Sequence, residues 1–295
     1  MKFIFSFFYQ KYFQLPHNYD SNTLSFKLLA RILNKCISLE FTLRKKPIKS
    51  SKIDGFVLSL TSHGKRTQHV YKTIYSILRE EIQPEKLVLW LSEADWNDSN
   101  LPDKLRKLKN WGVEIRFVKD LGPHTKYYYS FKKFKNYRIL TIDDDKLYPS
   151  KFFELFAEKS NQFPANILCA GARIIPRNHE NISYWNWELS WNSNNLEEAN
   201  LIPLGVMGVL YPPSFIQQLE ANLLDIGYGE FFTTDDLYLK LLSLTYPTPI
   251  TLVNQWKRGF LNISESKYYV NLMKDNLVSN DKNWEKVKKK LEIQL

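Results

Sequence analysis

Cysteine is scarce in this chain, whose 295 residues contain only Cys36 and Cys169. Two cysteines are too few for a disulfide framework, and their separation does not match the spacing of metal ligands. We therefore expect both to be reduced core thiols in a reducing compartment.

Long hydrophobic runs are also missing. No stretch approaches the roughly 20 apolar residues that span a bilayer, and the opening apolar run, Phe3 to Phe8, is too short for a secretory signal. We therefore expect a cytoplasmic protein. A hydrophobic content of 44% with 24% charged residues is ordinary for a globular chain and excludes wholesale disorder.

The charge is unbalanced, with a formal net charge of +10. This excess favours an anionic partner, whether nucleic acid, an acidic lipid surface or a phosphorylated substrate, without distinguishing among them. Part of it lies in residues 25–40, where apolar residues recur at helical spacing beside Lys27, Arg31 and Lys35. This pattern predicts an amphipathic helix that either packs on its own domain or makes peripheral contact with the inner face of the cytoplasmic membrane.

From residue 55 onward, apolar strand patterns alternate with helical ones. The predicted strands are 56–60, 87–91, 113–118 and 137–142, and the predicted helices are 68–80, 101–110 and 126–135. Such alternation implies parallel βαβ units. We predict an α/β fold with a doubly wound, mostly parallel central sheet flanked by helices. Residues 51–260 would form this domain, between an N-terminal helical extension (1–50) and a C-terminal one (261–295).

Ligands of doubly wound sheets bind beyond the carboxyl ends of the strands. There the sequence places three consecutive carboxylates, Asp143, Asp144 and Asp145, which would repel one another unless a cation were present. Mg²⁺ and Mn²⁺ take one or two carboxylates together with phosphate oxygens. Because alternate residues of an extended segment point the same way, Asp143 and Asp145 can share a site. The alternative is an acidic run that caps the helix after Pro149.

A strand that ends in Ile142-Asp143-Asp144-Asp145, with Tyr148-Pro149 just after it, resembles the DxD signature of GT-A glycosyltransferases, particularly bacterial enzymes of lipopolysaccharide or capsule synthesis. The resemblance implies a GT-A-like fold, bound Mn²⁺ or Mg²⁺, a nucleotide-sugar donor such as a UDP-sugar, and a glycan or lipid-linked glycan acceptor. It assigns nucleotide contact to Asp143 and Asp144, and places the metal on Asp145 with Asp143.

Two further loops resemble nucleotide-binding segments of that family. The first holds Thr61, Ser62 and Arg66 after the first strand, and the second holds Asp120 and Lys126 ahead of the aspartate run. The resemblance implies that Lys126 meets a phosphate. As alternatives, the first segment is a surface loop and the second a solvated helix start.

The family's catalytic base matches an acidic pair that opens a helix, Asp235 and Asp236, with Asp236 preferred. A carboxylate there would take the proton of the acceptor hydroxyl, and a single base with direct displacement would invert the anomeric configuration. Helix capping by Thr233 or Thr234 with an acidic first turn explains the same residues. Gly208, in a segment resembling the family's donor-sugar strand, permits close ligand approach or marks a bulged strand.

Aromatic residues crowd one segment, and Trp185 and Trp187 are the candidates for contact with the sugar. Their rings either stack on sugars or anchor an irregular loop in the core. The chain departs from the commonest family pattern at Ser92-Glu93, where the family usually has an aspartate that contacts the base of the nucleotide. The identity of the nucleotide therefore stays open.

Two other functions share some of these features. A sugar-phosphate nucleotidyltransferase would have the same sheet and carboxylates but needs a glycine-rich loop, and residues 61–67 hold only Gly64. A non-enzymatic nucleic-acid-binding protein would explain the charge alone, and its binding would survive loss of Asp143 and Asp145. We expect a glycosyltransferase without a nucleic-acid partner.

Overall fold

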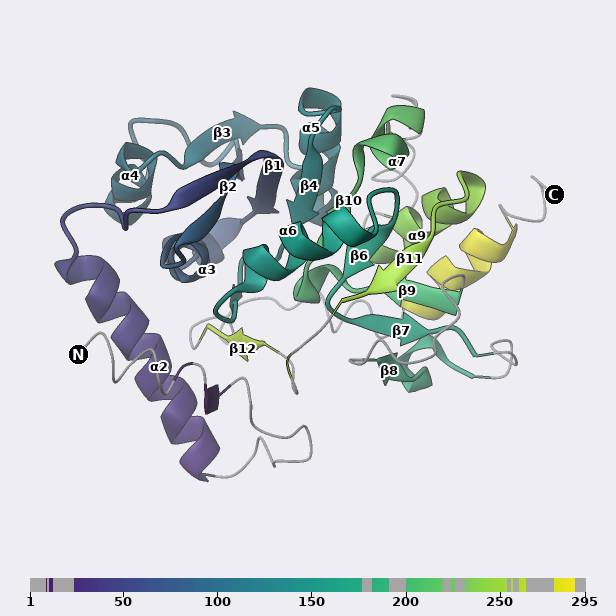
Figure 1. Ribbon diagram of the computed structural model, residues 1–295, viewed down its shortest axis with the longest axis horizontal. Helices are drawn as coiled ribbons and strands as arrows, with labels where there is room; N and C mark the ends of the chain where they lie inside the picture. The colour runs from purple at the N-terminus through teal and green to yellow at the C-terminus, as the bar shows by residue number, and fades with distance from the viewer. Residues whose placement is uncertain are drawn as a thin grey trace.

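The computed structural model describes residues 9, 11–12, 24–176, 182–190, 200–219, 224–225, 231, 233–253, 256, 260–263 and 279–289. In this part of the chain, seven strands form the central sheet: β1 (Ser51–Thr61), β2 (Ile82–Ser92), β3 (Glu114–Val118), β4 (Arg138–Thr141), β6 (Ile167–Cys169), β10 (Val209–Tyr211) and β11 (Ile250–Leu252). Their order is β11-β6-β10-β4-β1-β2-β3 (Figure 1).

The sheet is mostly parallel. Strand β1 pairs in parallel with β2 and β4, β2 with β3, and β6 with β11, whereas β10 runs antiparallel to both β4 and β6. The four predicted strands and the helices between them are all present, so the predicted fold class is confirmed. The strand order reverses between β1 and β4, which is where doubly wound sheets bind ligands.

Helices cover both faces of the sheet (Figure 1). One face packs against α2 (Leu24–Leu43), α3 (Tyr71–Leu78), α4 (Asp103–Asn110) and α6 (Phe152–Gln162), and the other against α5 (Thr125–Lys133), α7 (Pro213–Gln218), α9 (Asp235–Thr245) and the helical residues 279–289. Because side chains alternate along a strand, Leu58 and Leu60 of β1 enter the first core and Val57 enters the second.

Helix α2 runs along the outside of the molecule, as Figure 1 shows. It confirms the helix expected at residues 25–40, and Leu33, Ile37 and Phe41 attach it to the core through α3. Leu29 is half-buried against the same core, whereas Leu28, Ile32, Leu39 and Leu43 are exposed. None of the described helices combines the length and apolar character needed to cross a bilayer. The proposed domain boundaries stay predictions.

Two small sheets lie beside the central one. Strand β5 (Lys146–Leu147) pairs with β12 (Leu261–Asn262), and β7 (Ala172–Ile174) pairs with β8 (Leu189–Ser190) and β9 (Leu201–Pro203). The first of these returns the chain beyond residue 260 to the aspartate run, because Ile263 N donates to Asp145 O at 2.8 Å.

Candidate functional site

The three aspartates after β4 point to different partners. Asp144 is only 5% exposed. Its carboxylate accepts a hydrogen bond from Ser62 Oγ at 2.5 Å and forms an ion pair with Arg66 at 3.2 Å. Asp143 and Asp145 keep 33% and 23% of their side chains exposed. Asp144 and Asp145 form a turn between β4 and β5, and in this turn Asp144 faces the protein while Asp143 and Asp145 stay partly exposed. Burial raises the pKa of Asp144 to about 6, although Arg66 opposes the rise.

Lys126 stands at the centre of the site. Its ammonium lies 2.7 Å from Asp143 Oδ1 and 2.9 Å from Asp235 Oδ2, and the side chain is 6% exposed. Helix α5 carries it, held on the sheet by a hydrogen bond from Ser59 Oγ to Lys126 O at 2.5 Å. Lys126 therefore joins the end of β4 to the start of α9.

Charge complementarity sets the protonation of this cluster. Burial disfavours the ammonium, yet Asp143, Asp235 and Asp236 outweigh that effect and raise the pKa of Lys126 well above its ordinary value. Burial would raise the pKa of Asp143, but Lys126 holds it below its ordinary value. Lys126 is therefore an ammonium and Asp143 a carboxylate at neutral pH.

Asp236 meets the cluster from the first turn of α9. Its Oδ1 accepts the amide of Gly205, at 2.9 Å, from the 3₁₀ turn η6 (Gly205–Met207). A Cβ at Gly205 would lie 2.9 Å from Lys126 Nζ and 3.0 Å from Asp236 Oδ1, so any other residue would make these two groups shift. Burial, and then the charge of Asp235, raise the pKa of Asp236 well above its ordinary value. Sequence reasoning selected Gly208 and overlooked Gly205.

Helix capping is not what Asp236 does. Thr234 occupies the N-cap position of α9 with no side-chain cap bond, and Asp236 reaches out to another segment. His124 ties Phe231, which precedes α9, to the start of α5. It is fully buried, with Nε2 2.8 Å from Phe231 O and Nδ1 2.8 Å from Tyr127 Oη. Burial lowers the pKa of His124, so the ring is neutral and donates from Nε2 to that carbonyl.

Asp145 has one carboxylate oxygen that fits a divalent cation. Its Oδ1 is buried and accepts no hydrogen bond from the described residues, although Lys146 Nζ lies 3.2 Å away. A carboxylate oxygen with an unused lone pair suits a cation. Across the described ranges, no group of three or more His, Cys, Asp or Glu side chains could hold a metal. A cation here would therefore need phosphate oxygens as further ligands.

Other predicted residues lie outside this cluster of contacts. Thr61 Oγ1 donates to Trp90 O at 3.0 Å, and exposed Asp120 accepts the amide of Gly122 at 2.8 Å in the turn that leads into α5. Gly208 has φ +88, and a Cβ there would lie 2.5 Å from Phe152 Cζ. What approaches Gly208 closely is therefore the protein's own side chain.

The aromatic segment is built around Arg173 of β7. The guanidinium stacks on the rings of Tyr184 and Trp185, each 4.9 Å away, and donates to Trp187 O at 2.8 Å. Trp187 is 3% exposed and packs edge-on against Trp284. Trp187 is thus a core anchor, whereas Trp185 is half-buried and keeps part of its surface accessible.

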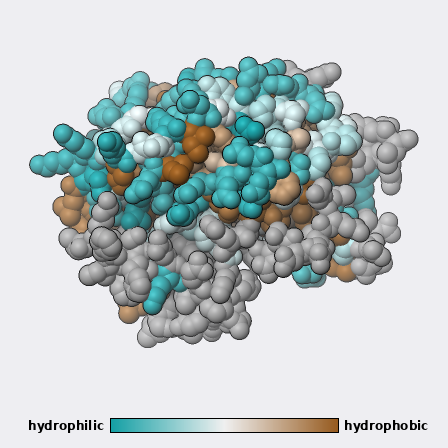
Figure 2. Space-filling view, viewed as in Figure 1, coloured by the Kyte–Doolittle hydropathy of each residue, from teal (hydrophilic) through white to brown (hydrophobic). Residues whose placement is uncertain are grey.

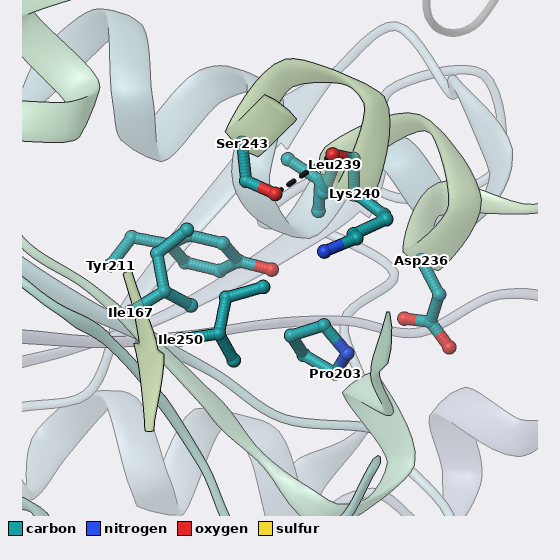
Figure 3. Close-up of a pocket in the computed structure, with 8 residues that line it drawn as sticks. All are labelled: Ile167, Pro203, Tyr211, Asp236, Leu239, Lys240, Ser243 and Ile250. Atoms are coloured by element: carbon teal, nitrogen blue, oxygen red, sulfur yellow. Dashed lines mark hydrogen bonds between the residues drawn. The ribbon is translucent and has the colours of Figure 1, made fainter. Parts of the chain in front are cut away.

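A small cavity lies behind Asp236, between α9 and the sheet (Figure 3). Lys240 points into it toward the Tyr211 hydroxyl, and Ser243 Oγ donates to Lys240 O at 2.8 Å. Burial lowers the pKa of Lys240 to about 8. Lys240 lies one turn along α9 from Asp236, so the same face of this helix carries a second buried polar group beside the cavity.

No family model and no curated protein matches this sequence. Similar solved structures include S. aureus TarS 1-349, with 11% identity over 72% of this chain and a TM-score of 0.47. A second is the mannosyltransferase PcManGT from Pyrobaculum calidifontis in complex with GDP-Man and Mn²⁺, with 10% identity over 77% and a TM-score of 0.46. The chain spans 62% of the length of each of these two.

A third similar structure is 4-diphosphocytidyl-2C-methyl-D-erythritol synthase, with 12% identity over 75% of this chain and 96% of that one, and a TM-score of 0.42. These three likenesses concern the path of the chain alone.

Proposed function

We propose that this chain is a divalent-cation-dependent glycosyltransferase that moves a sugar from a nucleoside diphosphate donor, most simply a UDP-sugar, to a hydroxyl of a glycan or lipid-linked glycan. One observation supports it above the others: Lys126 joins Asp143, at the end of β4, to the acidic pair at the start of α9. The assignment to lipopolysaccharide or capsule synthesis rests on the DxD resemblance alone, and the cytoplasmic location stays a prediction from the sequence.

Donor binding is assigned to the edge where β1 and β4 end. Arg66 is partly exposed and pairs with Asp144, and Lys126 pairs with the neighbouring Asp143. Arg66 can face a diphosphate, whereas Lys126 is only 6% exposed and would first have to part from Asp143 or Asp235. Asp145, with Asp143, would hold Mn²⁺ or Mg²⁺, whose charge would offset the negative charge that develops on the departing diphosphate.

Proton transfer is assigned to Asp236. Because Gly205 N–H occupies Oδ1, Oδ2 is the oxygen that receives the proton of the attacking hydroxyl. A raised pKa makes the carboxylate a stronger base, and a base works best when its pKa approaches the working pH. The acceptor oxygen then forms the new bond to the anomeric carbon as the bond to the diphosphate breaks, which inverts the configuration.

The test begins with thermal unfolding in the presence of a panel of nucleotides and nucleotide-sugars with Mn²⁺, because a ligand that binds the folded chain raises the melting temperature. The best donor is then used in a transfer assay. Asp236→Asn should keep the thermal shift but lower transfer by about 10²- to 10⁴-fold. Asp145→Asn should abolish the Mn²⁺-dependent activity.

A matched control is Asp54→Asn, which changes an exposed aspartate far along β1 from the site. Unchanged activity in both site variants would refute the proposal. Release of pyrophosphate from a nucleoside triphosphate, in place of release of a nucleoside diphosphate from a nucleotide-sugar, would identify a nucleotidyltransferase.

A further inference from the structure

The outer face of α2 is apolar although it faces away from the core. Leu28, Ile32, Leu39 and Leu43 are 55%, 46%, 49% and 62% exposed. Spacings of four, seven and four residues place them in one stripe along the helix. The buried residues Leu33, Ile37 and Phe41 lie on the opposite side, so α2 is apolar on two faces.

This stripe gathers most of the exposed large apolar side chains in the described part of the molecule, and the other two, Phe163 and Leu189, lie apart from it. In Figure 2, hydrophobic atoms lie among hydrophilic ones on the coloured part of the visible face. Core packing explains the inner face of the helix but gives no reason for the outer one.

The charges around the stripe are mostly positive. Residues 24–50 contain seven basic side chains and a single acidic one, Glu40. Glu40 is already engaged by Arg44 at 3.6 Å and Arg79 at 3.3 Å. The exposed basic residues of this segment are Lys27, Arg31, Lys35, Lys45, Lys46 and Lys49. An apolar stripe flanked by basic side chains is the pattern of a helix that lies in the interface of an anionic bilayer.

We propose that the outer face of α2 is a docking surface for an anionic phospholipid bilayer. The apolar stripe enters the boundary between headgroups and acyl chains, and the flanking lysines and arginine meet the lipid phosphates. The complementary charge selects a membrane over a second copy of this chain, because a copy would bring the same basic side chains to the contact. The inference does not depend on the proposed glycosyl transfer.

The docking surface is connected to the candidate site. Asn34 on α2 donates to Asn262 O at 3.1 Å, and Asn262 belongs to β12, which pairs with β5 directly after Asp145. Helix α2 therefore has a fixed place relative to the aspartate run. A membrane-bound chain would hold its site at a set height above the lipid surface.

The experiment measures sedimentation of the full chain with vesicles. We expect binding to phosphatidylcholine vesicles that contain phosphatidylglycerol, weak binding to pure phosphatidylcholine, and a decrease with added salt. Ile32→Glu/Leu39→Glu should abolish binding. Arg31→Gln/Lys35→Gln should weaken it roughly 10- to 30-fold, from the usual contribution of a basic residue near an anionic surface.

The matched control for the apolar variant is Phe163→Glu/Leu189→Glu, which changes exposed apolar residues elsewhere and should leave binding intact. Equal binding to both lipid compositions, or equal loss in control and α2 variants, would overturn the proposal. So would a dimer of the wild-type chain that Ile32→Glu/Leu39→Glu converts to monomer, because the stripe would then be an interface between copies.

A second measurement does not depend on the folding of the glutamate variants. An environment-sensitive fluorophore on Leu39→Cys, in a Cys36→Ser background, should shift to shorter wavelength when anionic vesicles are added. The same fluorophore on Leu189→Cys should not shift. An unshifted label at position 39 would contradict insertion of the stripe.

Discussion

Replacing Lys126 by methionine tests the electrostatics of the site directly. Methionine keeps most of the length and volume of the side chain but removes the ammonium that lies between Asp143 and Asp235. The carboxylates of Asp143, Asp235 and Asp236 would then face one another without a cation. We expect this variant to fold but to be strongly destabilised above neutral pH.

The size of the effect follows from the two contact distances. At 2.7 and 2.9 Å, each pair attracts with about 6 kcal/mol at an effective dielectric constant of about 20, before the cost of desolvation is subtracted. Loss of one partner of a buried ion pair typically costs about 3–5 kcal/mol, and we expect that loss for Lys126→Met at pH 8. The exposed pair of Lys132 with Asp225 gives the matched control, Lys132→Met, which should cost below about 1 kcal/mol.

The cost of Lys126→Met should depend on pH. In the wild type, Lys126 lowers the pKa of Asp143, so this pair stabilises the fold above the ordinary aspartate pKa and loses its effect only as the pH falls further. Without the ammonium, the carboxylates would have raised pKa values and the folded variant would take up protons on acidification. The difference between wild type and variant should therefore shrink from pH 8 to pH 5.

Urea unfolding followed by tryptophan fluorescence at pH 5, 6.5 and 8 measures this difference. Millimolar Mn²⁺ should restore more stability to Lys126→Met than to the wild type, because a cation would again separate the carboxylates. A cost that stays below 1 kcal/mol, or one that is the same at pH 5 and pH 8, would show that Lys126 does not compensate these charges.

Three further outcomes are expected. Gly205→Ala should lower transfer roughly 10- to 100-fold with little change in melting temperature, since its Cβ would displace Lys126 or Asp236; a fully active alanine variant would contradict this. Burial raises the pKa of Asp144 to about 6, so the stability of the fold falls as the pH rises from about 4 to 6. Asp144→Asn should therefore add up to about 3 kcal/mol to the free energy of unfolding at pH 8 and nothing at pH 4. Unfolding curves at the two pH values measure this. The raised pKa of Asp236 predicts that kcat/KM rises with pH as its proton leaves, and a pH profile that is flat in the wild type would exclude this base.

The regular part of the fold could be predicted from the sequence because its signals are local. Buried strands such as 56–60 and 87–91 appear as short apolar runs, and the helices between them have their own spacing. The sequence also suggests that Asp144 points away from Asp143 and Asp145. Asp144 does contact Ser62 and Arg66 instead, but a turn at residues 144–145, and not an extended pleat, directs it there. Strand β10 has only three residues, and its antiparallel place between β4 and β6 depends on partners far along the chain.

The contacts of the site could be predicted less well. Lys126 was expected to meet a phosphate, and no local pattern indicates that it reaches Asp235 at the other end of the domain. Gly205 and Gly208 look alike in sequence, and only the packing of Phe152 against one and of Lys126 against the other separates them. No sequence pattern indicated a role for Arg173, because its contacts are with aromatic rings that only the fold brings around it.

The pairing of β12 with β5 makes the segment beyond residue 260 a neighbour of the aspartate run. The amide of Ile263 holds the carbonyl of Asp145, and Leu261 lies opposite Leu147. A shortened chain that stops at residue 260 would release the backbone on which Asp145 is mounted, even with every strand of the large sheet intact. Engineers who trim this protein should therefore keep residues 261–263, and loss of function after such trimming would say nothing about chemistry in the tail itself.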